Sequence, residues 1–180
     1  MNRLLIWGAL AFALAAGPAL AQSQQPYAGL EGRSIKALSE QQIADLRAGR
    51  GMGLALVAEL NGYPGPIHVL ELAHSLDLSD QQRAKMQELF AAMKAEAIPL
   101  GEKLIAQEAD LDRQFASKTI TPASLAASTD AIGTTHAALR RTHLKYHLFT
   151  LEVLTPAQIR RYAELRGYKT GLEHPHGRHQ

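Results

Sequence analysis

The sequence contains no cysteine and carries almost no net charge. Without cysteine the chain cannot form disulfides, thiolate nucleophiles or cysteine-based metal sites. Its 19 basic and 17 acidic side chains give a formal charge of +2, a balance that does not indicate a nucleic-acid partner. Beyond the N-terminus no apolar run approaches the ~20 residues that a transmembrane helix needs. We therefore expect helix packing to stabilise the fold.

Motifs that support catalysis are also missing. The sequence contains no Gly-x-Ser-x-Gly elbow, no His-Glu-x-x-His and no paired-carboxylate pattern. A glycine-rich stretch, Gly49–Gly53, lacks the preceding strand that a phosphate-binding loop requires, so we interpret it as a flexible joint or a point of close packing. We expect that the protein is not an enzyme and that it requires no cofactor.

The N-terminus has the pattern of a cleavable secretory signal. Arg3 precedes an apolar run at Leu4–Ala16, and small residues follow at Ala19–Ala21. The apolar run is too short for a membrane span. These features predict export to the periplasm, cleavage after Ala21 and a mature chain that does not span the membrane.

Composition and breaker residues divide the chain into five segments. We predict a signal peptide at residues 1–21 and a flexible lead-in at 22–37. An N-terminal helical segment at 38–65 and a helical-hairpin domain at 66–170 follow, and the chain ends in a disordered histidine-containing tail at 171–180.

A short phrase frames the hairpin domain. Leu78, Ser79 and Gln82 form one copy, and the second copy consists of Leu154, Thr155 and Gln158. Each phrase reads as a capping box, with Ser or Thr as N-cap and Gln at N3. A third copy at residues 38–42 shows that the phrase is also an ordinary helix start.

Apolar residues between the two copies recur at helical spacing. They predict one helix over about 80–116, whose apolar stripe includes Met86 and Phe115, and a return helix from Pro122 to Val153, with Leu125 in its stripe. Pro99 lies inside the first helix and should bend it. The predicted fold is all-α, a long bent antiparallel hairpin with short flanking helices.

The return helix has a second apolar face. Leu144, Leu148 and Leu151 lie roughly 120–180° around the helix from the hairpin stripe. A helix with two apolar faces needs two partners, which can be the flanking helices or another subunit. This surplus suggests a homodimer or a binding surface.

The histidines suggest a metal hypothesis. His143 and His147 are four residues apart and share a helix face with His136, while His68, Glu71 and His74 share a short helix. Such imidazole and carboxylate ligands suit Zn²⁺, Ni²⁺, Co²⁺ or Cu²⁺. The alternative is that the helix histidines are half-buried and hydrogen-bonded and that the tail histidines are solvated.

The two Leu-Ser/Thr-x-x-Gln phrases, in an exported and cysteine-free helical chain, resemble those of the Spy/CpxP family of periplasmic stress proteins. The resemblance covers roughly residues 66–168. It implies a cradle-shaped dimer that binds partly unfolded exported proteins without ATP. Eight residues are candidates for the client surface: Lys85, Met86, Met93, Arg140, Arg141, Leu144, Leu148 and Leu151.

The resemblance also leaves two other functions open. The family has a metal-sensing and metal-resistance branch that is similar in placing histidines before the first phrase and late in the hairpin, which are the regions of His68, His74, His143 and His147. The spacing of His68 and His74 departs from the His-x-x-x-His of that branch. A third hypothesis is a helical adaptor for a membrane sensor kinase or an anti-sigma partner.

Overall fold

The computed structural model describes residues 26–168, so the predicted signal peptide and histidine-containing tail lie outside the described residues. The chain divides into two units at residues 1–31 and 32–180. In the first unit the described residues form a turn, closed by the Leu30 N–H donating to the Tyr27 carbonyl at 3.0 Å. Within residues 26–168, all six α-helices belong to the second unit.

The second unit is helical, as predicted, and no β-strand occurs in the described residues. Its six α-helices follow a 3-10 turn at Leu30–Gly32 that spans the boundary between the units. They are α1 at Glu40–Arg47, α2 at Leu56–Glu59, α3 at Pro66–Glu71, α4 at Asp80–Ala116, α5 at Pro122–Val153 and α6 at Pro156–Leu165. Within residues 26–168 no helix combines the length and the apolar character needed to cross a bilayer.

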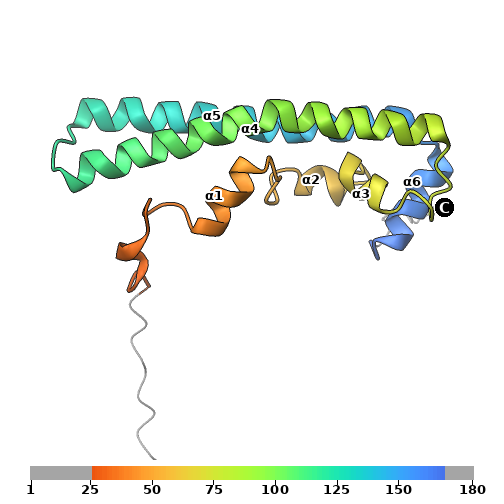
Figure 1. The fold of residues 1–180 in the computed structure, drawn as a ribbon, viewed down its shortest axis with the longest axis horizontal. Helices are drawn as coiled ribbons and strands as arrows, with labels where there is room; N and C mark the ends of the chain where they lie inside the picture. Colours follow the sequence, from red (N-terminus) through yellow and green to blue (C-terminus); the bar gives the residue numbers. More distant parts are fainter. Residues whose placement is uncertain (1–25, 169–180) are drawn as a thin grey trace, which may run out of the picture. The chain divides into compact units, whose positions relative to one another are not determined.

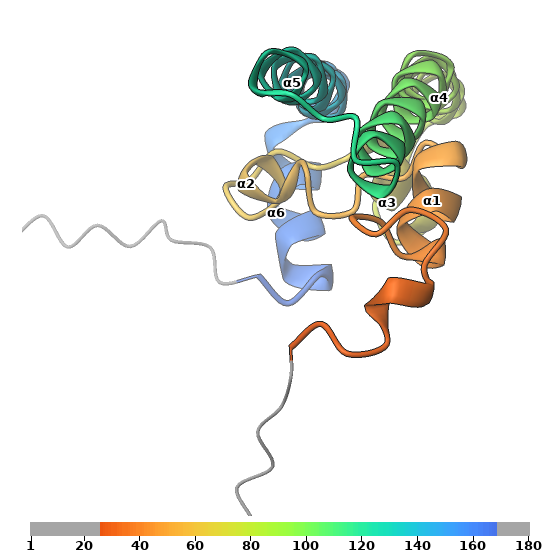
Figure 2. The same ribbon diagram turned by 90° about the vertical axis from the view of Figure 1, so that its left-hand side faces the viewer.

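The long helices α4 and α5 form the predicted antiparallel hairpin (Figure 1). Ser79 caps α4, and Thr121 caps α5 with Pro122 in the first turn, where the missing N–H is tolerated. The α4 helix continues through Pro99 and changes direction along its length in both views (Figures 1 and 2). Since proline lacks the N–H that closes a helical turn, Pro99 accounts for a bend at this point.

The short helices lie along one side of the hairpin (Figures 1 and 2). Two apolar clusters join them to it. One cluster, near the two motif phrases, includes Val69 of α3, Met86 of α4 and Tyr146 of α5. The other packs Leu46 of α1 against Ala97 of α4 and further residues of the hairpin. The N-terminal segment therefore covers one face of the hairpin.

The predicted apolar stripes are buried only near the motif phrases. Met86 of α4 is fully buried, whereas Phe115 at the other end of the same stripe is 54% exposed and Leu125 of α5 is also exposed. The apolar stripe predicted for α4 is therefore buried at the motif end and exposed near the turn. Small side chains such as Ala126 and Ala127 dominate α5 there, and neither apolar cluster reaches this end.

Candidate functional site

The glutamines of the two motif phrases bind each other across the open end of the hairpin. The Gln82 amide donates to Gln158 Oε1 at 2.9 Å and to the Val153 carbonyl at 3.0 Å. The Gln158 amide donates to Gln82 Oε1 at 3.0 Å and to the Leu76 carbonyl at 3.2 Å. We call this reciprocal pair the glutamine clasp.

The clasp uses the whole hydrogen-bonding capacity of both amides. Each side-chain oxygen also accepts the N–H of its own cap residue, from Ser79 to Gln82 at 3.1 Å and from Thr155 to Gln158 at 2.9 Å. A glutamine amide has two donor hydrogens and an oxygen with two acceptor sites, so none is left over. The two capping boxes thereby become one structure that ties the starts of α4 and α6 together.

The third copy of the phrase forms a cap and nothing more. Ser39 and Gln42 make the same reciprocal box at the start of α1, with the Ser39 N–H donating to Gln42 Oε1 at 2.8 Å. Gln42 is exposed and makes no hydrogen bond to a more distant part of the chain. A matching phrase therefore does not by itself create a clasp, because the clasp needs a second glutamine opposite.

Residues 49–65 cross the hairpin face, and we call this segment the strap. Its contacts with the hairpin are made partly by glycine backbone. A Cβ atom on Gly49 would lie 3.1 Å from Ile98 Cγ1, and one on Gly65 would lie 2.9 Å from His147 Cε1. The interpretation of Gly49–Gly53 as a point of close packing holds for Gly49 and Gly51, which approaches the His143 ring in the same way.

A buried carboxylate links the strap to the end of the chain. Glu59 is 7% exposed, and its Oε1 accepts from the hydroxyls of Tyr162 and, at 2.9 Å, Tyr168. Arg166 Nε lies 3.6 Å from the same oxygen. Burial and the bond to Glu59 raise the pKa of Tyr162 well above its ordinary value. Glu59 therefore anchors the strap to the residues of α6 and just beyond it.

Two histidines of α5 lie beneath the strap. His147 Nδ1 donates to the Tyr63 carbonyl at 2.6 Å and lies 3.9 Å from Glu59 Oε2. His143 is buried, and this burial, with the neighbouring His147, lowers the pKa of His143 below its ordinary value, so the ring is neutral at pH 7. These positions match the alternative that helix histidines are structural.

Two buried atoms under the strap have no hydrogen-bond partner, Glu59 Oε2 and His143 Nε2. A cavity of about 590 Å³ lies at the same place, between the strap, α3, Phe90 and Met93 of α4, and the two histidines of α5. The strap thus covers a space that the interior does not fill.

The structure does not bring the predicted metal ligands together as one set. His136 and His74 are exposed, whereas His143 and His147 are buried under the strap. His68 pairs with Glu71 instead, at 3.0 Å. Among residues 26–168 no three His, Cys, Asp or Glu side chains are placed to hold one metal ion. Metal binding stays a prediction.

The candidate client residues divide between core and surface. Met86 and Met93 are buried in the apolar core, so their burial removes them from a surface that a client can reach. The reason is that their stripe faces α3, α5 and α6 at the motif end. The other six lie at the surface or partly so: Lys85, Arg140, Arg141 and Leu148 are exposed, and Leu144 and Leu151 are half-buried.

The largest group of exposed apolar side chains lies on the strap. Ten large apolar side chains of the described residues are exposed, and five of them fall between residues 52 and 63. These five, 36–56% exposed, are Met52, Leu56, Val57, Leu60 and Tyr63, and we call them the strap patch. Sequence reasoning assigned this stretch to a helix and overlooked its surface.

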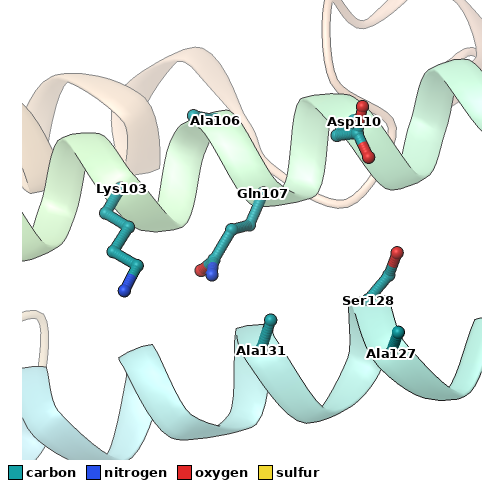
Figure 3. A pocket seen from close by; sticks show the side chains of 7 residues that line it. All are labelled: Lys103, Ala106, Gln107, Asp110, Ala127, Ser128 and Ala131. Carbon is teal, nitrogen blue, oxygen red and sulfur yellow. The ribbon is translucent and has the colours of Figure 1, made fainter.

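The turn half of the hairpin holds a second space, of about 410 Å³, between α4 and α5. Figure 3 shows Lys103 and Gln107 pointing from α4 toward α5, where Ala131 and Ser128 face them. The buried Gln107 Oε1 has no hydrogen-bond partner. The small side chains of α5 leave this space open, and nothing lines it that suggests catalysis.

Glu59, Tyr162, Arg166 and Tyr168 were missed by sequence reasoning. One signal was available, because Glu59 is the single charged residue in the apolar run from Leu54 to Leu60. A lone carboxylate in such a run needs a buried partner. The tyrosines gave no comparable signal, since their spacing also fits an ordinary amphipathic helix.

Comparisons with known proteins give one match. The family described as LTXXQ motif family protein matches residues 68–166, which contain both phrases of the clasp. No curated protein and no solved structure matches this chain. The strap lies outside the matched residues.

Proposed function

We propose, because the chain belongs to the LTXXQ motif family, that it acts in the periplasm as an ATP-independent chaperone of the Spy/CpxP type. Such a protein binds partly unfolded exported proteins and suppresses their aggregation during envelope stress. Family membership supports this class of protein broadly, and the strap patch suggests where a client would bind.

The strap patch is the observation that carries the proposal. Half of the exposed large apolar side chains in the described residues lie in twelve consecutive positions. Concentrated apolar surface on a folded protein marks an interaction site. Apolar contact is also non-directional, so it suits clients that share exposed apolar segments but no sequence.

Pairing of two chains is part of the proposal. Leu148 is 52% exposed on α5, and Phe149 beside it is also exposed. Leu148 belongs to the second apolar face of α5 for which the sequence predicted a partner, and Leu144 and Leu151 of that face are half-buried. A second copy would cover it, which supports a homodimer. The proposed activity needs no metal, nucleotide or catalytic step.

The test replaces apolar side chains of the patch without disturbing the fold. In a light-scattering assay, a cysteine-free client protein is diluted from urea with increasing amounts of the chaperone. We expect Leu56→Gln/Val57→Gln/Leu60→Gln to raise the concentration needed for half suppression at least tenfold, since the loss of even one buried apolar side chain costs ~1.5–3 kcal/mol.

The matched control changes exposed apolar residues far from the strap. Phe115→Gln/Leu125→Gln alters two side chains at the turn of the hairpin and should leave suppression unchanged. Circular dichroism should show native helix content in both variants. Equal loss in both, or no loss in the strap variant, would remove the strap patch as the client site.

A further inference from the structure

Part of the contact between the strap and the hairpin is made by backbone rather than by side chains. Gly49, Gly51 and Gly65 approach α4 and α5 closely, as the short distances to their absent Cβ atoms show. The larger strap side chains of the strap patch are exposed instead. A covering segment usually buries its apolar side chains. This strap therefore makes less apolar contact with the hairpin than its composition would allow.

The closed position of the strap is also strained. Met52 has a φ of 43°, in the left-handed region that side chains other than glycine rarely occupy. Glu59 Oε2 and His143 Nε2 make no hydrogen bond within the protein, although both residues line the pocket beneath the strap. Lifting the strap would release the backbone of Met52 and expose both atoms fully.

An apolar surface lies beneath the strap. Phe90 and Met93 of α4 line the cavity of about 590 Å³ on the hairpin side, with His143 and His147 of α5. The volume lies in the range of pockets that hold ligands.

We infer that the strap is a displaceable cover and that the hairpin surface beneath it binds apolar segments of unfolded chains once the strap lifts. The inference rests on the proposed function and adds its regulation. The closed strap limits the apolar surface that the resting protein exposes. A client captured by the strap patch would then gain a second contact when the strap moves away from α4 and α5.

The test locks the strap with a disulfide, which is unambiguous because the chain has no cysteine. In Gly51→Cys/His143→Cys a Cβ at position 51 lies 3.8 Å from the present Cγ of His143, near which the new sulfur would lie. This distance is compatible with a disulfide after a small shift. The reduced form of the same variant is the control, because it also lacks His143.

Suppression of client aggregation should be at least threefold weaker for the oxidised form than for the reduced form. Equal suppression by both forms and by the native chain would overturn the strap inference and leave the proposed function intact. If none of the three suppresses aggregation, the proposed function fails, and hydrogen exchange still tests the strap.

Amide hydrogen exchange of the unmodified protein is that second measurement. Amides of residues 50–61 should exchange at least 100-fold faster than those of residues 139–150, because lifting the strap exposes them while the hairpin stays folded. Equal protection of the two segments would show that the strap opens only when the whole fold does, and would overturn the inference.

Discussion

The two ends of the hairpin differ in how the same pair of helices is held together. At the motif end, α4 and α5 meet in an apolar core that α3 and α6 complete, and the glutamine clasp closes it. At the turn end, small side chains of α5 face α4 across a space, and Phe115 and Leu125 are exposed. Two continuous helices are therefore not equally stable along their length. The local stability depends on the size of the facing side chains and on whether other helices pack over them.

The capping boxes sharpen this comparison. Both ends use one, yet the box at the turn pairs Thr121 with Ser124, whose short side chain reaches only its own cap residue. The boxes at Ser79 and Thr155 have glutamine at the same place. The longer glutamine side chain can accept from its own cap residue and still donate to the glutamine of the other box. The added length therefore turns a local capping box into a tertiary contact.

The largest expected contrast lies in the core. Met86→Ala should lower the free energy of unfolding by about 3 kcal/mol, because it leaves a cavity in the fully buried motif end. Phe115→Ala, in the same helix, should change it by less than about 0.5 kcal/mol since the ring is exposed. Urea unfolding followed by circular dichroism measures both. Similar losses would mean that the turn end is packed as well as the motif end.

A smaller contrast separates a clasped glutamine from an unclasped one. Gln158→Ala should cost about 2 kcal/mol of unfolding free energy, since it removes both bonds between the glutamines and leaves the Leu76 carbonyl without its partner. Gln42→Ala removes only a local cap and should cost about 0.5 kcal/mol. The same unfolding experiment compares them. If the two costs were equal, the clasp would contribute no more than an ordinary capping box.

The smallest effect has the opposite sign. Gly133 lies inside α5, and a Cβ atom there would meet nothing within 4 Å. Gly133→Ala should stabilise the protein by about 0.5–1 kcal/mol, since alanine is the better helix former. At Gly101 the added Cβ would lie 2.5 Å from the Leu46 carbonyl oxygen, so Gly101→Ala should destabilise. Thermal unfolding measures both variants. If both raised or both lowered the melting temperature, the expected difference in packing around the two glycines would be contradicted.

Local signals in the sequence predicted the helices well. The phrase at Ser79 fixed the start of α4, and the turn signal at Thr121 and Pro122 fixed the start of α5, because capping depends on residues three positions apart. The all-α hairpin with short flanking helices followed from these boundaries and from the apolar spacing.

The candidate site could not be predicted in the same way. The strap contains only one short helix, α2, and its glycine contacts depend on which helices lie beneath it. Helical spacing placed Met93 on an apolar stripe but did not say whether a client or α3 would cover it. The clasp requires residues 76 positions apart to meet, a fact that no local pattern contains.

The position of the clasp opposite the turn also determines what a broken chain would do. The turn is exposed around Lys118, whose φ of 57° marks a tight reversal, and such a site is open to proteases. A cut there would produce two fragments, each carrying one clasp glutamine and one half of the apolar core. The two fragments would stay associated through the glutamine clasp and the apolar core that they share. The turn connects the long helices at one end and the clasp connects them at the other, so the pair can stay together when the turn is cut.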